Sequence, residues 1–250
     1  MKELLSCVMD IGEQMLISGA EVHRVEESVR RMCYAFGAQR IDVFIITSSM
    51  VVTVYDNGGG SYTQTRRILT SNTDFEKIHQ LNRLSREICE KKLDCRQIKN
   101  KLDVINKGKT YPVWAEFLCY ALIAGAFTVF FGGGVIETAV SFVIGAIVRF
   151  GIAVTNKVAA NKIFSKFFSS VLATAFAFAA VKFGIIEAAD KVIIGNIMSL
   201  IPGIGFTNAL RDLFTGDSIA GILRTIEAVL IALAIAAGYF LITALGGAVI

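Results

Sequence analysis

The second half of the chain carries long apolar stretches that a soluble core of ordinary size would not need. Residues 112–250 hold only 8 of the 25 Lys and Arg residues and 7 of the 21 Asp and Glu residues. The whole chain is 54% hydrophobic, with a mean hydropathy of +0.59, which is more apolar than a soluble protein usually is. This asymmetry predicts two parts in different solvents, one in water and one in a membrane.

The apolar half divides into five segments, each a candidate transmembrane helix. A helix needs about 20 residues to cross the roughly 30 Å hydrocarbon core, and inside lipid its backbone must satisfy its own hydrogen bonds. The segments lie at about residues 113–131, 135–154, 167–186, 192–206 and 218–244. The sequence therefore predicts an α-helical membrane protein with about five transmembrane helices over residues 112–250.

The charges that flank these segments predict their orientation. Basic residues precede the first segment and lie between the second and third, whereas the turns at 132–134 and 187–191 carry little net positive charge. The basic residues before the first segment are Arg96, Lys99, Lys101, Lys107 and Lys109. Since cytosolic flanks are enriched in Lys and Arg, we expect a multi-pass protein of the plasma or inner membrane, with the N-terminus in the cytosol and the C-terminus outside. The first residues show no signal-peptide pattern, in agreement with a cytosolic N-terminal part.

Residues 1–111 have the pattern of a small cytosolic α+β domain. Helical spacing of apolar residues predicts helices at 2–17 and 20–36, and Ser18 with Glu21 could form a capping box for the second. Runs rich in β-branched residues with a Gly-rich turn predict a three-stranded antiparallel sheet, followed by two more helices. The strands are expected at 40–47, 50–55 and 61–69, and the helices at 73–91 and 95–106. We expect the helices to cover one face of the sheet.

The sequence offers no cofactor, metal or nucleic-acid site. The five cysteines are scattered and form no CxxC or Cys–His cluster, which favours reduced thiols and no structural metal. Gly58-Gly59-Gly60 is better explained as a hairpin turn than as a phosphate loop, because no helix follows it. The net charge of +4 gives no support for nucleic-acid binding, and no nucleophile with a neighbouring base is apparent.

The fourth apolar segment is short, polar and interrupted. Asn196 and Ser199 lie within it, and Pro202 with Gly203 breaks it. Broken helices of this kind line solute sites in transporters, since freed backbone groups can coordinate a solute. A simple kink or a re-entrant loop without a ligand is the alternative. We expect a loop at 207–217 to follow.

Two pairs of ionisable residues lie beyond this break. Arg211 and Asp212 could attract an anionic group at the cytosolic mouth, or they could be an ordinary loop pair. Arg224 and Glu227 are spaced i, i+3 on the fifth helix, with Glu227 roughly 13 Å from the helix start at Ser218. A carboxylate at that depth is costly, which favours either a proton-coupling group or an Arg–Glu pair at the interface.

Two motifs in this chain resemble those of the threonine/serine exporter (ThrE) family. Ser18 to Glu26 is similar to the family's Gly-Ala-Glu-x-x-Arg-Val-Glu helix. The second motif comprises Pro202-Gly203, Asn208, Arg211-Asp212, Gly216-Asp217 and Arg224. The resemblance covers about residues 5–245. The chain resembles the short, YjjP-like branch, which has only the first half of a full-length member.

The resemblance implies a subunit of a secondary exporter. Its solute would be a small amino acid such as threonine or serine, or a dicarboxylate such as succinate. A companion membrane subunit would supply the other half, surrounded by membrane lipid. We expect the solute path to be shaped by Pro202, Gly203, Asn208 and Arg211 together with Asn196, Ser199 and Asp212. The proton motive force would drive export, and Glu227 with Arg224 would couple proton movement to it. A membrane-anchored hydrolase-like enzyme and a metabolite-sensing regulatory subunit are the alternatives.

Overall fold

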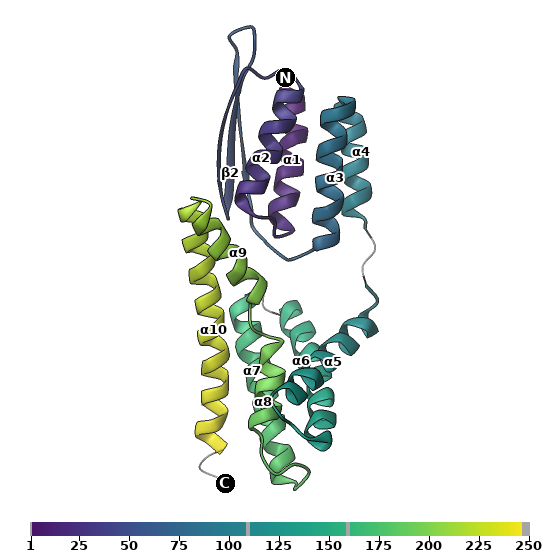
Figure 1. The fold of residues 1–250 in the computed structure, drawn as a ribbon, viewed down its shortest axis with the longest axis vertical. Coiled ribbons are helices and arrows are strands. Elements are labelled where there is room, and N and C mark those ends of the chain that lie inside the picture. Colours follow the sequence, from purple (N-terminus) through teal and green to yellow (C-terminus); the bar gives the residue numbers. More distant parts are fainter. Residues whose placement is uncertain (1, 109–110, 159–160, 247–250) are drawn as a thin grey trace. The chain divides into compact units, whose positions relative to one another are not determined.

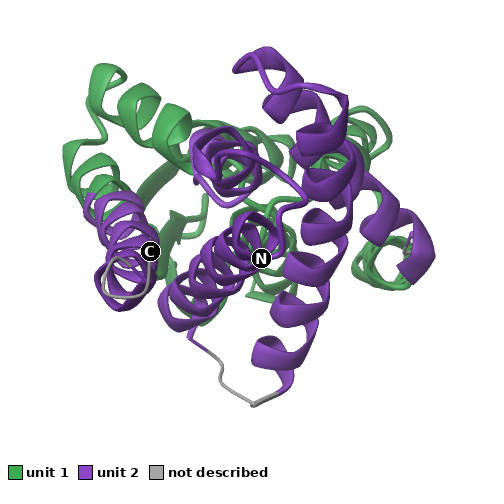
Figure 2. Cartoon of the chain, turned by 90° about the horizontal axis from the view of Figure 1, so that it is seen from below, with its two compact units in different colours: residues 1–109, 205–225 green, residues 110–204, 226–250 purple. Residues whose placement is uncertain are grey.

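The computed structural model describes residues 2–108, 111–158 and 161–246, and the chain forms two compact units (Figure 2). Unit 1 contains residues 1–109 and 205–225, and unit 2 contains residues 110–204 and 226–250. The protein is a helical membrane protein with a small sheet in its N-terminal part. Unit 1 therefore combines the N-terminal residues with a later segment, 205–225. Lys109 of the predicted basic flank lies outside the described residues.

Unit 1 is built in layers around a central pair of helices (Figure 1). The three-stranded sheet lies against one side of the α1–α2 pair, and α3 and α4 lie on the other side. The elements are α1 Lys2–Ile17, α2 Val22–Ala35, β1 Arg40–Ile46, β2 Ser49–Tyr55, β3 Ser61–Arg67, α3 Phe75–Lys91 and α4 Cys95–Asn106. The predicted antiparallel sheet and four helices are confirmed to within a few residues at their ends, because each has a clear hydrophobic period and a turn or cap beside it.

One face of the sheet supplies part of the core of unit 1. In β2 the side chains of Met50, Val52 and Val54 are buried, and the residues between them are only partly buried. The register pairs Ile41 with Val54 and Ile45 with Met50, so apolar side chains lie opposite one another on the inner face. This alternation is what a sheet with helices on one face requires.

The start of α2 differs from the predicted capping box. The helix begins at Val22 with Glu21 as its N-cap, whose side chain makes no capping hydrogen bond. The hydroxyl of Ser18 is buried without a hydrogen-bond partner among the described residues. Gly19 adopts φ +87°, and a Cβ there would lie 2.8 Å from the carbonyl oxygen of Asn72. This left-handed turn shifts the helix start beyond the reach of Ser18 and leaves the first N–H groups of α2 without a local cap.

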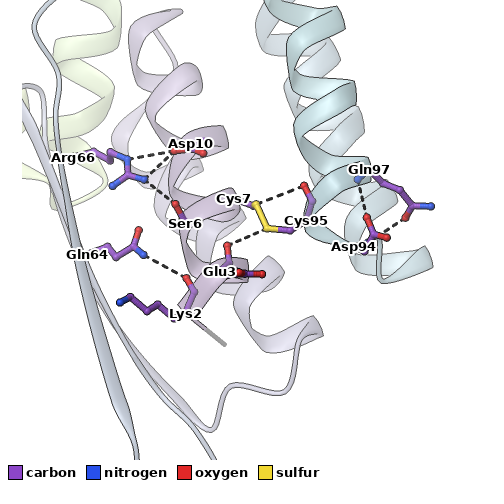
Figure 3. Close-up of a disulfide and its surroundings, with 10 residues drawn as sticks. All are labelled: Lys2, Glu3, Ser6, Cys7, Asp10, Gln64, Arg66, Asp94, Cys95 and Gln97. Carbon is purple, nitrogen blue, oxygen red and sulfur yellow. Dashed lines mark hydrogen bonds and ion pairs between the residues drawn. A yellow bond between two sulfur atoms is a disulfide. The ribbon is translucent and has the colours of Figure 1, made fainter.

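The expectation that the cysteines stay unpaired is wrong for Cys7 and Cys95, which form a disulfide between α1 and α4 (Figure 3). Their Cα atoms lie 6.1 Å apart although the residues are 88 positions apart in sequence. Figure 3 also shows Arg66 of β3 donating to Asp10 and Ser6 of α1. Sequence spacing carried no sign of this pairing, because the packing of α4 on α1 creates it.

Unit 2 is a bundle of apolar helices. It contains α5 Val113–Phe130, α6 Val135–Val158, α7 Lys162–Lys182, α8 Asp190–Met198 and the greater part of α10 Ser218–Gly246. Four described helices, α5, α6, α7 and α10, are long and apolar enough to cross a membrane. The broken pair of α8 with α9, Gly203–Phe214, would make a fifth crossing if it acts as one span. This range of four to five agrees with the predicted number.

Small residues allow the helices of unit 2 to approach closely. A Cβ on Gly145 would lie 2.7 Å from the carbonyl oxygen of Tyr120, and one on Gly238 would lie 2.6 Å from that of Phe167. Ala173 and Ala177 of α7 are fully buried. Small residues at these positions therefore let the helix backbones pack closely.

The predicted loop at 207–217 is largely helical. Helix α9 continues to Phe214, and Gly216 with φ +95° then turns the chain into α10. Leu213 of α9 lies against the first turn of α10, where a Cβ on Gly221 would come within 2.6 Å of its side chain. The charged residues of the segment favoured a loop, but one of them is buried by tertiary contacts that a local reading of the sequence does not contain.

Candidate functional site

The helical hairpin 205–225, which consists of most of α9 and the first turns of α10, packs within unit 1 against the start of α2. Asn208 donates to the carbonyl oxygen of Gly19 at 3.4 Å, and the Nη2 of Arg224 donates to that of Ala20 at 2.9 Å. Arg211 forms an ion pair with Glu21. The α1–α2 turn thus presents two carbonyl groups and a carboxylate to three side chains of the hairpin.

Asp212 lies at the centre of these contacts and is fully buried. The Nη1 of Arg224 is 3.0 Å from its Oδ2, and the Arg224 side chain itself is only 13% exposed. Neither carboxylate oxygen of Asp212 has a hydrogen-bond partner among the described residues. The carboxylate is therefore held by an ion pair with little additional solvation, which is an expensive arrangement for a charge.

The position of Asp212 also explains the uncapped start of α2. The N–H of Val22, the first residue of that helix, faces the carboxylate without reaching hydrogen-bond geometry. A helix N-terminus carries a partial positive charge, so an acidic group there is favourable. Asp212 supplies to α2, from a distant part of the chain, the negative charge that a local cap would otherwise provide.

A second polar cluster lies inside unit 2 and contains no charged side chain. Ser141 of α6 lies 2.7 Å from the hydroxyl of Thr128 of α5, and the amide of Asn196 of α8 donates to Ser141 at 2.8 Å. The same Asn196 amide donates to the carbonyl oxygen of Val192 at 2.9 Å. All three side chains are buried, so the cluster joins three helices through neutral hydrogen bonds.

Gly195 permits this cluster to form. A Cβ at this position would lie 2.2 Å from the Oγ1 of Thr128 and 2.9 Å from the carbonyl oxygen of Ala124. The backbone of α8 therefore approaches α5 more closely than any residue with a side chain would allow. The approach leaves the Oδ1 of Asn196 buried, with no hydrogen-bond partner among the described residues.

The remaining predicted path residues lie at or near the end of α8. Ser199 is the C-cap of this helix and donates to the carbonyl oxygen of Asn196 at 2.8 Å. Pro202 lies in the break, and Gly203 is the first residue of α9. The structure therefore brings Asn208, Arg211, Asp212 and Arg224 together in unit 1, and Asn196 and Ser199 together in unit 2.

Arg224 and Glu227 do not form the ion pair that was one of the two alternatives for them. Arg224 is engaged by Asp212 and Ala20, whereas Glu227 is exposed and makes no ion pair among the described residues. The i, i+3 spacing permits such a pair, but the desolvated carboxylate of Asp212 is the stronger competitor for the guanidinium.

Sequence reasoning did not single out several residues of these clusters. Glu21 was available as a signal, since it belongs to the Gly-Ala-Glu motif, but the local pattern predicted only a capping box with Ser18 for it. Thr128, Ser141 and Gly195 gave no signal, because isolated hydroxyls and glycines are common in apolar helices.

The described residues contain no group of three or more His, Cys, Asp and Glu side chains that could hold a metal ion. Burial raises the pKa of the Cys33 thiol to about 12, with a smaller contribution from Cys89, so this cysteine is not a nucleophile at neutral pH. The clusters instead supply hydrogen-bond donors, acceptors and one buried ion pair, which suit binding and conformational change.

Comparison with known proteins agrees with the resemblance drawn from the two motifs. A protein from Corynebacterium glutamicum described as a threonine/serine exporter is 26% identical over 249 residues, covering 91% of this chain and 48% of that protein. The chain thus spans about half the length of the relative. No solved structure matches this chain. The family model described as "Putative threonine/serine exporter" matches residues 6–246, and the chain therefore belongs to the threonine/serine exporter family.

Proposed function

We propose that this chain is a subunit of a secondary exporter that moves a small polar solute, such as threonine or serine, out of the cell. The family match supports this role, because it extends over both the N-terminal part and the apolar helices. Succinate is a further candidate solute, because hydrogen-bond donors and guanidinium groups also suit a dicarboxylate.

The observation that carries this proposal is the polar interior of an apolar bundle beside a broken helix. Asn196 is buried with an unpartnered amide oxygen, and α8 ends only a few residues later. A membrane anchor needs neither a buried amide nor a break, since both are costly in lipid. A solute path needs both, because a polar solute must exchange its water for protein hydrogen bonds.

We assign the solute path to the residues in and after this break. They are Asn196, Ser199, Pro202, Gly203, Asn208, Arg211 and Asp212. The proton motive force drives export in this scheme, and Glu227 with Arg224 is one candidate for the proton-coupling group.

The exporter needs a companion subunit in this proposal. The chain covers 48% of its relative, and four to five helices make a thin wall for a solute path. A second membrane subunit of the same family would complete the path. The basic residues before α5 support a cytosolic N-terminus, and an odd number of crossings would place the C-terminus outside.

Efflux from loaded proteoliposomes tests the proposal. Vesicles containing this chain, with or without the companion subunit, are loaded with radiolabelled threonine, serine or succinate, and a proton gradient is then imposed. Gradient-dependent efflux that requires both chains is the expected result. Absence of efflux of all three solutes, with both chains inserted, would contradict the proposal.

A matched pair of variants links the efflux to the broken helix. Asn196→Ala removes the buried amide, and Asn106→Ala removes an exposed amide at the end of α4. We expect efflux to fall at least about tenfold with the first variant and to stay unchanged with the second. Equal efflux from both variants would remove Asn196 from the path.

A further inference from the structure

Asp212 is unusual because it is a buried acid with few groups to stabilise its charge. Among the described residues it is the one acidic or basic side chain that is fully buried. Its ion pair with Arg224 is its principal stabilising contact, and its two oxygens accept no hydrogen bond there. Protonation of Asp212 would therefore break one ion pair and no hydrogen-bond network, so its carboxylate can take up a proton.

The other charged groups around Asp212 favour the uptake of a proton. Glu21 at the start of α2 and Asp217 before α10 are both acidic and both act on its carboxylate. The Oδ2 of Asp217 is itself buried without a hydrogen-bond partner among the described residues. Arg224 and the N–H of Val22 oppose these two acids, and Arg211 is engaged by Glu21. The cluster thus contains three carboxylates and two guanidinium groups, and one added proton balances its charge.

The segment that carries this cluster is joined at both ends to unit 2. The chain passes from unit 2 into the hairpin at residues 204–205 and returns at 225–226, within the continuous helix α10. Upstream of the first junction lie the end of α8 and the break at Pro202. Three residues of the proposed path, Asn208, Arg211 and Asp212, lie in the hairpin itself, so a release of the hairpin from α2 would move them relative to α2.

We propose that Asp212 is the proton-binding group of the transport cycle, and that its protonation releases the hairpin 205–225 from the start of α2. With Asp212 ionised, Arg224 holds the hairpin through both Asp212 and the carbonyl oxygen of Ala20. With Asp212 protonated, the ion pair is lost, and the negative charge that stabilises the start of α2 is lost with it. This inference rests on the proposed exporter function for its role in transport, but the release itself does not require that function.

The structure favours Asp212 over Glu227 for this role. Glu227 is exposed and has no charged partner among the described residues, so a proton on it changes no contact. A proton on Asp212 changes the contacts of α2, α9 and α10 together. A coupling group must alter the stability of one conformation relative to another, and Asp212 has the contacts that make this possible.

Hydrogen–deuterium exchange of the full chain in lipid nanodiscs tests the release. Exchange is measured at about pH 5 and about pH 8 and corrected for the intrinsic pH dependence. In the wild type, peptides covering residues 19–25 and 205–225 should exchange about tenfold faster at the lower pH. In Asp212→Asn they should exchange fast at both values, and in Glu227→Gln they should respond as the wild type does. No pH response in the wild type, or a response lost in Glu227→Gln and kept in Asp212→Asn, would overturn the proposal.

A second measurement does not depend on the folding of a variant. Infrared difference spectra of the wild type between the two pH values should show the carbonyl band of a newly protonated, buried carboxylic acid.

Reconstitution into the efflux assay then separates the proton-dependent release from the exporter function. A pH-dependent release without efflux of any tested solute would reject the exporter function and keep the switch, whereas coupled efflux without a release would reject the switch and keep the exporter.

Discussion

The two polar clusters of this protein both hold helices together, one through neutral hydrogen bonds and the other through charged groups. In unit 2, Thr128, Ser141 and Asn196 join three apolar helices through neutral hydrogen bonds. In unit 1, the hairpin is held to α2 by Asp212, Arg224, Arg211 and Glu21, all of which carry charge. Both clusters are built from residues distant in sequence, and both include a buried polar atom without a hydrogen-bond partner among the described residues.

The difference shows which structural role suits a neutral hydrogen bond and which suits a buried ion pair. A neutral hydrogen bond between helices costs little to form and contributes about 0.6 kcal/mol, so it suits constant packing. A buried ion pair is stable only while both partners are charged, and removal of one partner costs about 3–5 kcal/mol. The charged cluster is therefore suited to a contact that must open, and the neutral cluster to one that must persist.

The largest expected effect comes from breaking the buried ion pair. Arg224→Leu leaves Asp212 buried without its cation and should lower the free energy of unfolding by about 3–5 kcal/mol. Thermal unfolding of the full chain in detergent measures this change. The double variant Asp212→Leu with Arg224→Leu is the control, because removal of both charges should restore stability to within about 1 kcal/mol of the wild type. A double variant as unstable as the single one would show that the charges are not the cause.

The next effect comes from the close approach in unit 2. Gly195→Ala places a Cβ near the Thr128 hydroxyl and the Ala124 carbonyl oxygen, and should cost about 1–3 kcal/mol of stability through overpacking. Gly203→Ala is the matched control, since a Cβ there has no atom within 4 Å. It should be neutral or slightly stabilising in the same unfolding assay. If both variants had the same effect, the close helix contact would not limit the packing of unit 2.

A smaller effect is expected from the neutral cluster itself. Ser141→Ala removes the hydroxyl between Thr128 and Asn196 and should cost about 0.6 kcal/mol. Ser169 is the comparison, since its hydroxyl donates to the carbonyl oxygen of Ser165 on its own helix. Unfolding of Ser141→Ala and Ser169→Ala should separate a bond between helices from one within a helix. A loss of several kcal/mol in Ser141→Ala would mean that the cluster does more than hold helices together.

The smallest effect is expected at a partly exposed charged group of unit 1, Glu87. Hydrogen bonds from Lys101 and Lys91 lower the pKa of Glu87 to about 2. The pKa is lower when folded than its ordinary value of 4.5, so the contribution of Glu87 to stability is present above pH 4.5 and is lost as the pH falls toward 2. Lys101→Ala should weaken this acid dependence, and added salt should mask the difference. Lys99→Ala on the same helix is the control, and an equal change in both variants would contradict the assignment.

Much of the fold follows from local patterns in the sequence. Helix α4 begins and ends where the apolar spacing predicts, because Asp94 and Gln97 form a capping box at its start. The strands of the sheet follow from β-branched runs and the turn at 56–60. The prediction failed where a local signal competed with a tertiary one. The capping box predicted for Ser18 is absent because α2 begins only at Val22, after the turn at Gly19. The predicted loop at 207–217 is largely helix α9, in which Asp212 is buried.

The sequence by itself predicted the helices and the sheet of the N-terminal part and the long apolar helices that follow, since composition and hydrophobic period are local properties. It also identified Asp212 and Arg224 as residues of interest, and the family motif that contains them. Only the tertiary structure decided their partners. Arg211 meets Glu21 across 190 residues of sequence, and Cys7 meets Cys95 across 88. No local pattern encodes such contacts, because they arise when separately formed helices bury their faces against one another.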